Sequence, residues 1–173
     1  MARCTSKRDS LQRSENVTLL THDEYFRMSF QPSNPEFETE VRSSFAKQTA
    51  LTSIGAELVR VEPGVVEITI PYNPDLTQQN GFMHAGIITT IADTACGYAS
   101  YTLMPANSDV LSVEFKMNLL RPAKGSQFSA VAEVLKPGRT LTVVRADVFA
   151  TSRDRDRELI AAMLATMICL NKA

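Results

Sequence analysis

One long apolar stretch, residues 77–104, constrains this chain more than any other part of its sequence. It opens with the polar, glycine-containing segment Thr77–Gly81, continues for about twenty largely apolar residues, and ends before Pro105. Its apolar residues fall on every side of an α-helix, which predicts a helix buried on most sides. An acidic residue within the stretch, and strand patterns after it, favour a core helix over a membrane span.

Asp93 is the one acidic residue of this predicted helix, and no basic residue lies within four positions of it. Burying a carboxylate without a partner costs free energy, so its presence requires an explanation. Two interpretations remain open from the residues alone. Asp93 is either a core residue hydrogen-bonded to backbone groups or a catalytic carboxylate that faces a cleft.

The residues around Asp93 form a recognisable motif. His84-Ala85-Gly86 precedes the helix, and Asp93 follows nine positions after His84 within the tetrapeptide Ala-Asp-Thr-Ala. With this motif, the sequence resembles the phenylacetate-degradation-type branch of the hotdog-fold acyl-CoA thioesterases, whose usual form is His-Gly-Gly. The resemblance covers about residues 50 to 173. It implies an α+β hotdog fold, in which an antiparallel sheet of about five to six strands wraps around one long central helix.

Strand patterns flank the central helix on both sides. Strands are expected at residues 54–61, 66–70, 110–120, 128–135 and 140–151, and a short amphipathic helix is expected at residues 36–51. Within residues 110–120, strict alternation predicts one apolar face and one polar face. The apolar face would carry Leu111, Val113, Phe115, Met117 and Leu119, and the polar face Ser112, Glu114, Lys116 and Asn118.

The last apolar segment, residues 159–170, is ambiguous. Its Ala, Leu and Met content favours a helix by propensity, whereas a strand covered on both faces has the same composition. The hairpins before it, together with the resemblance, favour the strand. The charged run Arg153–Arg157 is expected to be a solvated hairpin tip.

Length and composition limit the remaining possibilities. A chain of 173 residues is long enough for one domain with a real core. We expect a polar, mobile extension at residues 1–35 and a hotdog domain at residues 36–173. The net charge of −1 and a pI of about 6.1 argue against a nucleic-acid partner. The three cysteines lack metal-ligand spacing, and no apolar leader precedes the domain, so we expect a cytoplasmic protein without disulfides, metal or membrane partner.

The resemblance implies roles for five residues. Thioester hydrolysis needs a carboxylate that activates water or attacks the carbonyl, and donors that stabilise the oxyanion. Asp93 is implied as the general base or nucleophile, with Gln78 contacting the thioester or the water and Ser112 orienting the water. Ala85 and Gly86 lie at the helix start, where free N–H groups and the helix dipole suit an oxyanion. Ala85 retains the N–H of the usual glycine and would be strained only at a positive φ.

Further residues have less certain roles. The resemblance implies that His84 is a structural residue at the helix entrance more than a base. Arg121 and Arg139 are implied near the nucleotide end of coenzyme A, although each also fits an ordinary surface turn. No cofactor is implied, and a homodimer or homotetramer with sites shared between subunits is expected.

The expected function is hydrolysis of an acyl-CoA to a free acid and CoA. Two alternatives stay open: a hotdog hydratase or dehydratase, which would need a histidine base paired with an acid, and a non-catalytic acyl-CoA-binding module. The sequence has no Gly-x-Ser-x-Gly motif, which argues against a serine esterase.

Overall fold

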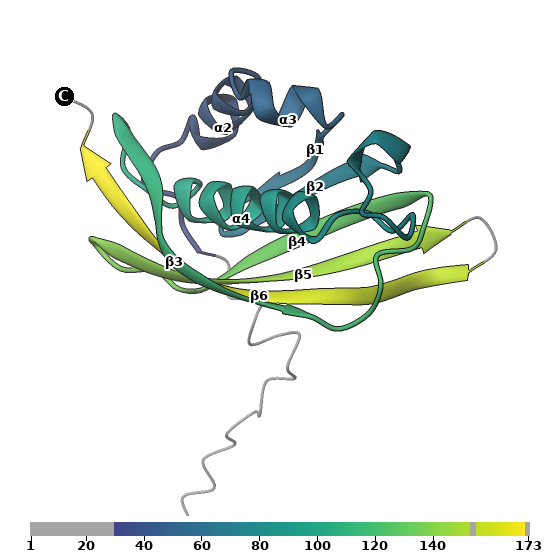
Figure 1. The fold of residues 1–173 in the computed structure, drawn as a ribbon. Coiled ribbons are helices and arrows are strands. Elements are labelled where there is room, and N and C mark those ends of the chain that lie inside the picture. Colours follow the sequence, from purple (N-terminus) through teal and green to yellow (C-terminus); the bar gives the residue numbers. More distant parts are fainter. Residues whose placement is uncertain (1–29, 153–154, 172–173) are drawn as a thin grey trace, which may run out of the picture.

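A six-stranded antiparallel sheet curves around one long helix in the computed structural model, which describes residues 30–152 and 155–171 (Figure 1). The helices are α2 Phe37–Phe45, α3 Thr49–Ser53 and α4 Ala85–Tyr101, with a 3-10 helix η1 Pro74–Leu76. The strands are β1 Glu57–Glu62, β2 Val65–Pro71, β3 Ser108–Leu119, β4 Gln127–Lys136, β5 Leu141–Ser152 and β6 Arg155–Asn171. Their order in the sheet is β1-β2-β4-β5-β6-β3, so the predicted hotdog architecture is confirmed.

Helix α4 lies in the concave face of the sheet and forms the centre of the core (Figure 1). Its fully buried residues include Ile91, Ala92, Ala95 and Ala99, while β4 and β5 present small inward-facing residues such as Ala130, Ala132 and Ala146. These short side chains allow the helix to approach the sheet closely, so α4 is a core helix as predicted. No helix in the described part of the chain is long and apolar enough to cross a membrane.

The ambiguous C-terminal segment is strand β6, as predicted, and it lies between β5 and β3. Ala161, Met163, Ala165 and Met167 are buried against the helix side of the sheet. Leu164 on the opposite face is 49% exposed, so β6 is not covered on both faces within one chain.

Strand β3 departs from strict alternation because its pairing with β6 shifts register between Ser112 and Glu114. A β-bulge of this kind inserts one residue and reverses which face the following residues occupy. Ser112 therefore pairs with buried Met167 and faces α4, while Glu114 hydrogen-bonds Thr166 on the outer face. The predicted single polar face of this strand is wrong at Ser112, and Leu111 lies on the outer face.

Residues shortly before α2 are already packed. The described chain begins at Phe30, which packs against the core, and Asn34 is buried with its side chain accepting the N–H of Glu36 at 3.0 Å. The expected helix over residues 36–51 is two short helices, α2 and α3. The expected mobility of residues 1–29 lies outside the described residues.

The hairpin between β5 and β6 is only partly a solvated tip. Residues 153–154 lie outside the described chain, but Arg157 belongs to β6. Its guanidinium donates to Glu67 at 2.9 Å and to Ser129 at 2.8 Å, and it lies 4.2 Å from the centre of the Phe149 ring. Arg157 therefore ties β6 to β2 and β4 across the outer face of the sheet.

Candidate active site

Asp93 lines a cavity, and its carboxylate accepts a hydrogen bond from a side chain. It is half-buried on α4, and the hydroxyl of Ser112 on β3 donates to its Oδ1 at 2.6 Å. The cavity has a volume of about 250 Å³. Its other lining residues are Ser44, Gln48, Thr94, Gly97, Tyr98, Asp109, Val110 and Leu111. Of the two interpretations of Asp93, the core residue bonded to backbone does not describe this geometry.

The two expected oxyanion donors at the start of α4, the N–H groups of Ala85 and Gly86, differ in their hydrogen bonds. His84 is the N-cap, and its Nδ1 accepts the N–H of Gly86 at 2.9 Å. The N–H of Ala85 has no acceptor among the residues that the structure describes. Ala85 therefore carries the available N–H at the positive end of the helix dipole.

The alanine at position 85 is compatible with its backbone. Asn107 has the one positive φ among the described non-glycine residues, so Ala85 adopts an ordinary helical conformation and is not strained. His84 has φ −63° and ψ 136°, an extended conformation that turns its side chain back over the first helical turn. In this arrangement, the Nδ1 lone pair of His84 serves the helix cap.

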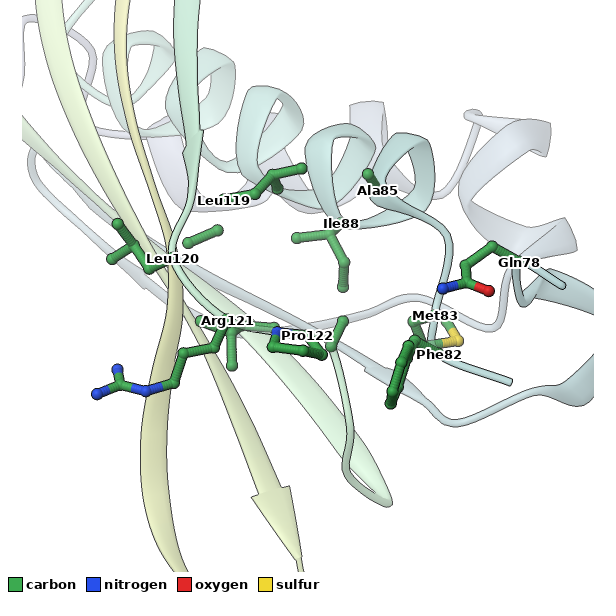
Figure 2. Close-up of a pocket in the computed structure, with 12 residues that line it drawn as sticks. Gln78, Phe82, Met83, Ala85, Ile88, Leu119, Leu120, Arg121 and Pro122 are labelled. Atoms are coloured by element: carbon green, nitrogen blue, oxygen red, sulfur yellow. The ribbon is translucent and has the colours of Figure 1, made fainter. Parts of the chain in front are cut away.

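Gln78 and Ala85 line a second cavity of about 460 Å³ (Figure 2). The loop that carries Gln78 is closed by two backbone hydrogen bonds, Gln78 N–H to Phe82 at 2.9 Å and Gly81 N–H to Gln78 at 3.0 Å. The Gln78 side-chain oxygen accepts the N–H of Asn80, which leaves its amide nitrogen turned toward the cavity (Figure 2). The remaining lining is mostly apolar and comes from α4, β3, β6 and the segment after β3.

The two candidate CoA-binding arginines lie at opposite ends of α4. Arg121 lines the Gln78 cavity with its stem, but its guanidinium points away, donates to the carbonyl of Leu159 at 2.9 Å and pairs with Glu158 at 3.1 Å (Figure 2). Arg139 lines a separate cavity of about 410 Å³ with Leu103, beyond the C-terminal end of α4. One chain does not bring these two cations together.

The carboxylate and the oxyanion donor are also apart within one chain. Asp93 lies eight residues after Ala85 on the same helix, which is about 12 Å along its axis at 1.5 Å per residue. A nucleophile and an oxyanion donor must both come within about 3 Å of the reacting group. One chain therefore contains two halves of a site.

Sequence reasoning missed the far wall of the Asp93 cavity, which is built from Ser44, Gln48, Gly97 and Tyr98. Of these residues, the sequence pattern indicated only Tyr98, as one of the buried positions of the central helix. Nothing local shows that the segment from α2 to α3 meets α4 there. No group of three or more potential metal ligands occurs among the described residues.

Comparison with known proteins identifies the family. The family model described as Thioesterase superfamily matches residues 80–155, from the loop before α4 to the start of β6. A thioesterase family protein from Silicibacter pomeroyi has a crystal structure that is 48% identical, covers 78% of this chain and 98% of its own, and superposes with a TM-score of 0.76. This chain belongs to the thioesterase superfamily and is a thioester hydrolase.

Two more distant proteins share the fold or the sequence pattern. The structure of the E. coli PaaI protein from the phenylacetic acid degradation operon is 14% identical, covers 80% of this chain and 96% of its own, and has a TM-score of 0.71. At this identity, the likeness shows the hotdog fold alone. A medium/long-chain acyl-CoA thioesterase of Salmonella typhimurium is 22% identical over 66% of this chain and 81% of its own.

Proposed function

We propose that this thioester hydrolase acts on acyl-CoA and that Asp93 of one subunit works with Gln78 and Ala85 of a second subunit. The observation that carries the proposal is the 2.6 Å hydrogen bond from Ser112 to Asp93 at the edge of a cavity. The hydroxyl donates to one carboxylate oxygen, which leaves the other oxygen to accept a proton from water or to attack the thioester carbonyl.

Strand β3 is the element through which two subunits could pair. It lies at the end of the sheet, so one edge of the strand is open within the described chain. Val113, Phe115 and Leu119 are 53%, 44% and 57% exposed along it, which is unfavourable for apolar side chains on an edge strand. A second copy of β3, placed antiparallel about a two-fold axis, would bury them and continue the sheet.

This pairing completes the site. In an antiparallel pair, the Leu119 end of one β3 lies beside the Ser108 end of the other. The first end carries the Gln78 and Ala85 cavity, and the second carries Asp93 and Ser112. The Ala85 N–H then polarises the thioester carbonyl, while the partner's Asp93 either takes a proton from the attacking water or attacks the carbonyl carbon itself.

The same pairing accounts for the two arginines. Arg121 follows the C-terminal end of β3, and Arg139 lies beside its start, where the N–H of Cys169 donates to the carbonyl of Thr140 at 2.8 Å. Antiparallel pairing brings Arg121 of one subunit and the partner's Arg139 to the same end of the assembly. There they can bind the phosphates of coenzyme A.

The decisive experiment mixes two inactive variants. Asp93→Asn removes the carboxylate, and Ala85→Pro removes only an N–H at the first helical position, where proline is well tolerated. The extended backbone of His84 also suits the position before proline. After random subunit exchange, about half of the dimers are mixed, and each mixed dimer has one complete site and one doubly altered site. Activity should therefore return to about one quarter of the wild-type value.

Each result of this mixing experiment has a definite meaning. Thiol release from an acyl-CoA that reappears only after subunit exchange supports the shared site. Ala85→Gly, which retains the N–H, is the control and should remain active. If the mixture stays inactive although light scattering detects dimers, the shared site is wrong. If the wild-type chain is a stable monomer at micromolar concentration and hydrolyses acyl-CoA, pairing is not required.

A further inference from the structure

We infer that the 250 Å³ cavity beside Asp93 is the acyl pocket, that it takes a short acyl group, and that it selects one with a hydrogen-bonding atom at its far end. This inference rests on the proposed function, because it places the thioester between Asp93 and the Ala85 N–H of the second subunit. From that point, the acyl group and the coenzyme A arm must leave in different directions.

The two cavities that meet at the thioester differ in size and character. The Gln78 cavity is the larger, at about 460 Å³, and Arg121 stands at its rim. A cation at the rim suits the phosphate-bearing arm of coenzyme A. The smaller cavity beside Asp93 has a mostly polar lining and is left for the acyl group.

The volume of the cavity beside Asp93 limits the length of the acyl group that it can hold. Since one water molecule occupies about 30 Å³ in the liquid, a cavity of about 250 Å³ holds about eight non-hydrogen atoms. This corresponds to a six-carbon acyl chain with one further polar atom or to one substituted ring. A chain of ten or more carbon atoms would extend beyond the walls of this cavity.

Gly97 keeps the cavity open. It lies four residues after Asp93 on α4, so it faces the same side one helical turn further along. A methyl group added to Gly97 would meet no atom of the described chain within 4 Å apart from its own neighbours and helix backbone. Glycine costs about 1 kcal/mol relative to alanine inside a helix, and no contact in the described chain requires it here. The open space beside Gly97 therefore suits a bound ligand.

The far wall can bind a polar atom. The Tyr98 hydroxyl donates to Ser44 Oγ at 3.1 Å and accepts from Gln48 Nε2 at 2.7 Å. Among the described residues, the Ser44 hydroxyl proton has no acceptor and the Gln48 side-chain carbonyl has no donor. Tyr98 lies about 7.5 Å along the helix axis from Asp93, five residues at 1.5 Å each. A hydroxyl, keto or amide group at the end of a six-carbon chain reaches this wall.

Four substrates and three variants test the inference. The substrates are butanoyl-CoA, hexanoyl-CoA, 6-hydroxyhexanoyl-CoA and decanoyl-CoA, and the readout is kcat/KM for thiol release. The wild-type protein should prefer 6-hydroxyhexanoyl-CoA to hexanoyl-CoA and should hydrolyse decanoyl-CoA poorly. Tyr98→Phe should lower the preference for the hydroxylated chain by about three- to tenfold, because the Tyr98 hydroxyl holds Ser44 and Gln48 in position for one neutral hydrogen bond to the substrate. Tyr101→Phe is the matched control, because its hydroxyl donates to Glu40 at 3.0 Å and does not line the cavity.

Gly97→Ala gives an independent test that does not depend on Tyr98. It should raise the melting temperature by about 2–4 °C through helix propensity. It should also lower kcat/KM for hexanoyl-CoA by about tenfold while sparing butanoyl-CoA, because one methyl group fills the far part of the pocket. The melting temperature would then rise while kcat/KM for hexanoyl-CoA falls. If Gly97 had only a structural role, the substitution would not change kcat/KM for one substrate alone.

Other results would overturn the inference. If Gly97→Ala and Tyr98→Phe change kcat/KM by one common factor for all four substrates, the cavity does not hold the acyl group. Efficient hydrolysis of decanoyl-CoA by the wild-type protein would also contradict it. Both outcomes leave the proposed function intact, whereas an absence of thiol release from every acyl-CoA would refute the two together.

Discussion

The hydroxyl of Ser112 on β3 donates to the carboxylate of Asp93 on α4 at 2.6 Å, across the edge of the sheet. The contact depends on the β-bulge after Ser112, which turns this serine toward the helix while Glu114 faces away. The bulge thus aims one side chain of an edge strand at a half-buried carboxylate. Bulges next to active sites commonly have this effect.

Asp93→Asn tests the role of the carboxylate. The amide has the same size and can still accept the Ser112 proton, but it cannot take a proton from water. Turnover should fall by on the order of 10² to 10⁴, the usual range for loss of a general base, while the melting temperature changes little. Asp147→Asn, on the outer face of the sheet beside Arg145, is the matched control. Near-normal turnover by folded Asp93→Asn would show that the carboxylate is structural.

Ser112→Ala and Gln78→Ala should each cost less than Asp93→Asn, because each residue only positions the water or the thioester. A hydrogen bond to a charged group contributes about 1.5–3 kcal/mol, so we expect Ser112→Ala to lower kcat by about ten- to a hundredfold. Ser126→Ala is the control, since that hydroxyl donates to the carbonyl of Thr151 at 3.1 Å, away from Asp93. Steady-state kinetics on one acyl-CoA would compare them. A loss in Ser112→Ala as large as in Asp93→Asn would contradict a positioning role.

The sequence was sufficient for the architecture because its main signals are periodic and local. The apolar stretch before Pro105 and the alternating strands predict a buried helix among antiparallel strands, and the resemblance implies that the sheet wraps around that helix. The hairpins before the ambiguous last segment, together with the resemblance, favour the strand that the structure shows. The bulge at Ser112 was not predictable, since one inserted residue leaves the composition of β3 unchanged. The pairing of Ser44 with Tyr98 was also beyond reach, because it joins residues 54 positions apart.

The resemblance supplied candidate site residues that periodicity could not. Without the motif around His84, Gln78 would be an ordinary loop residue and Ser112 an ordinary strand residue. The structure adds a distinction that the motif does not contain, since Gly86 gives its N–H to His84 and Ala85 does not. It also separates Arg121 from Arg139, which sequence order alone had left as equivalent candidates.

Truncation at two points tests the N-terminal boundary. Deleting residues 1–29 removes mostly polar side chains and should leave the melting temperature and turnover nearly unchanged. Deleting residues 1–33 also removes Phe30, whose ring lies where a side chain at Gly64 would stand and which packs against the core. The longer deletion should lower the melting temperature by several degrees, as loss of a packed aromatic ring does. Equal melting temperatures for the two deletions would show that Phe30 adds nothing to stability.

Cys96 provides a test of pH dependence. Its thiol is fully buried on α4, and its pKa is raised above the ordinary 9.0, first by burial and second by the charge of Asp93. The folded protein therefore keeps the thiol proton at a pH where the unfolded chain loses it. The stabilisation is complete below pH 9 and is lost as the pH rises further, with a slope that approaches about 1.4 kcal/mol per pH unit for one proton.

Chemical denaturation at several pH values from 7 to about 10.5 measures this slope. Cys96→Ala should flatten the fall of unfolding free energy above pH 9 relative to the wild-type protein, because that proton no longer differs between the two states. Cys169→Ala is the matched control and should leave the slope unchanged, since Cys96 still supplies the proton. All other ionisable groups are common to the wild-type protein and the two variants, so their contributions cancel in the comparison. Parallel curves for Cys96→Ala and wild type would mean that the Cys96 thiol ionises equally well in the folded state, contrary to its burial beneath the sheet.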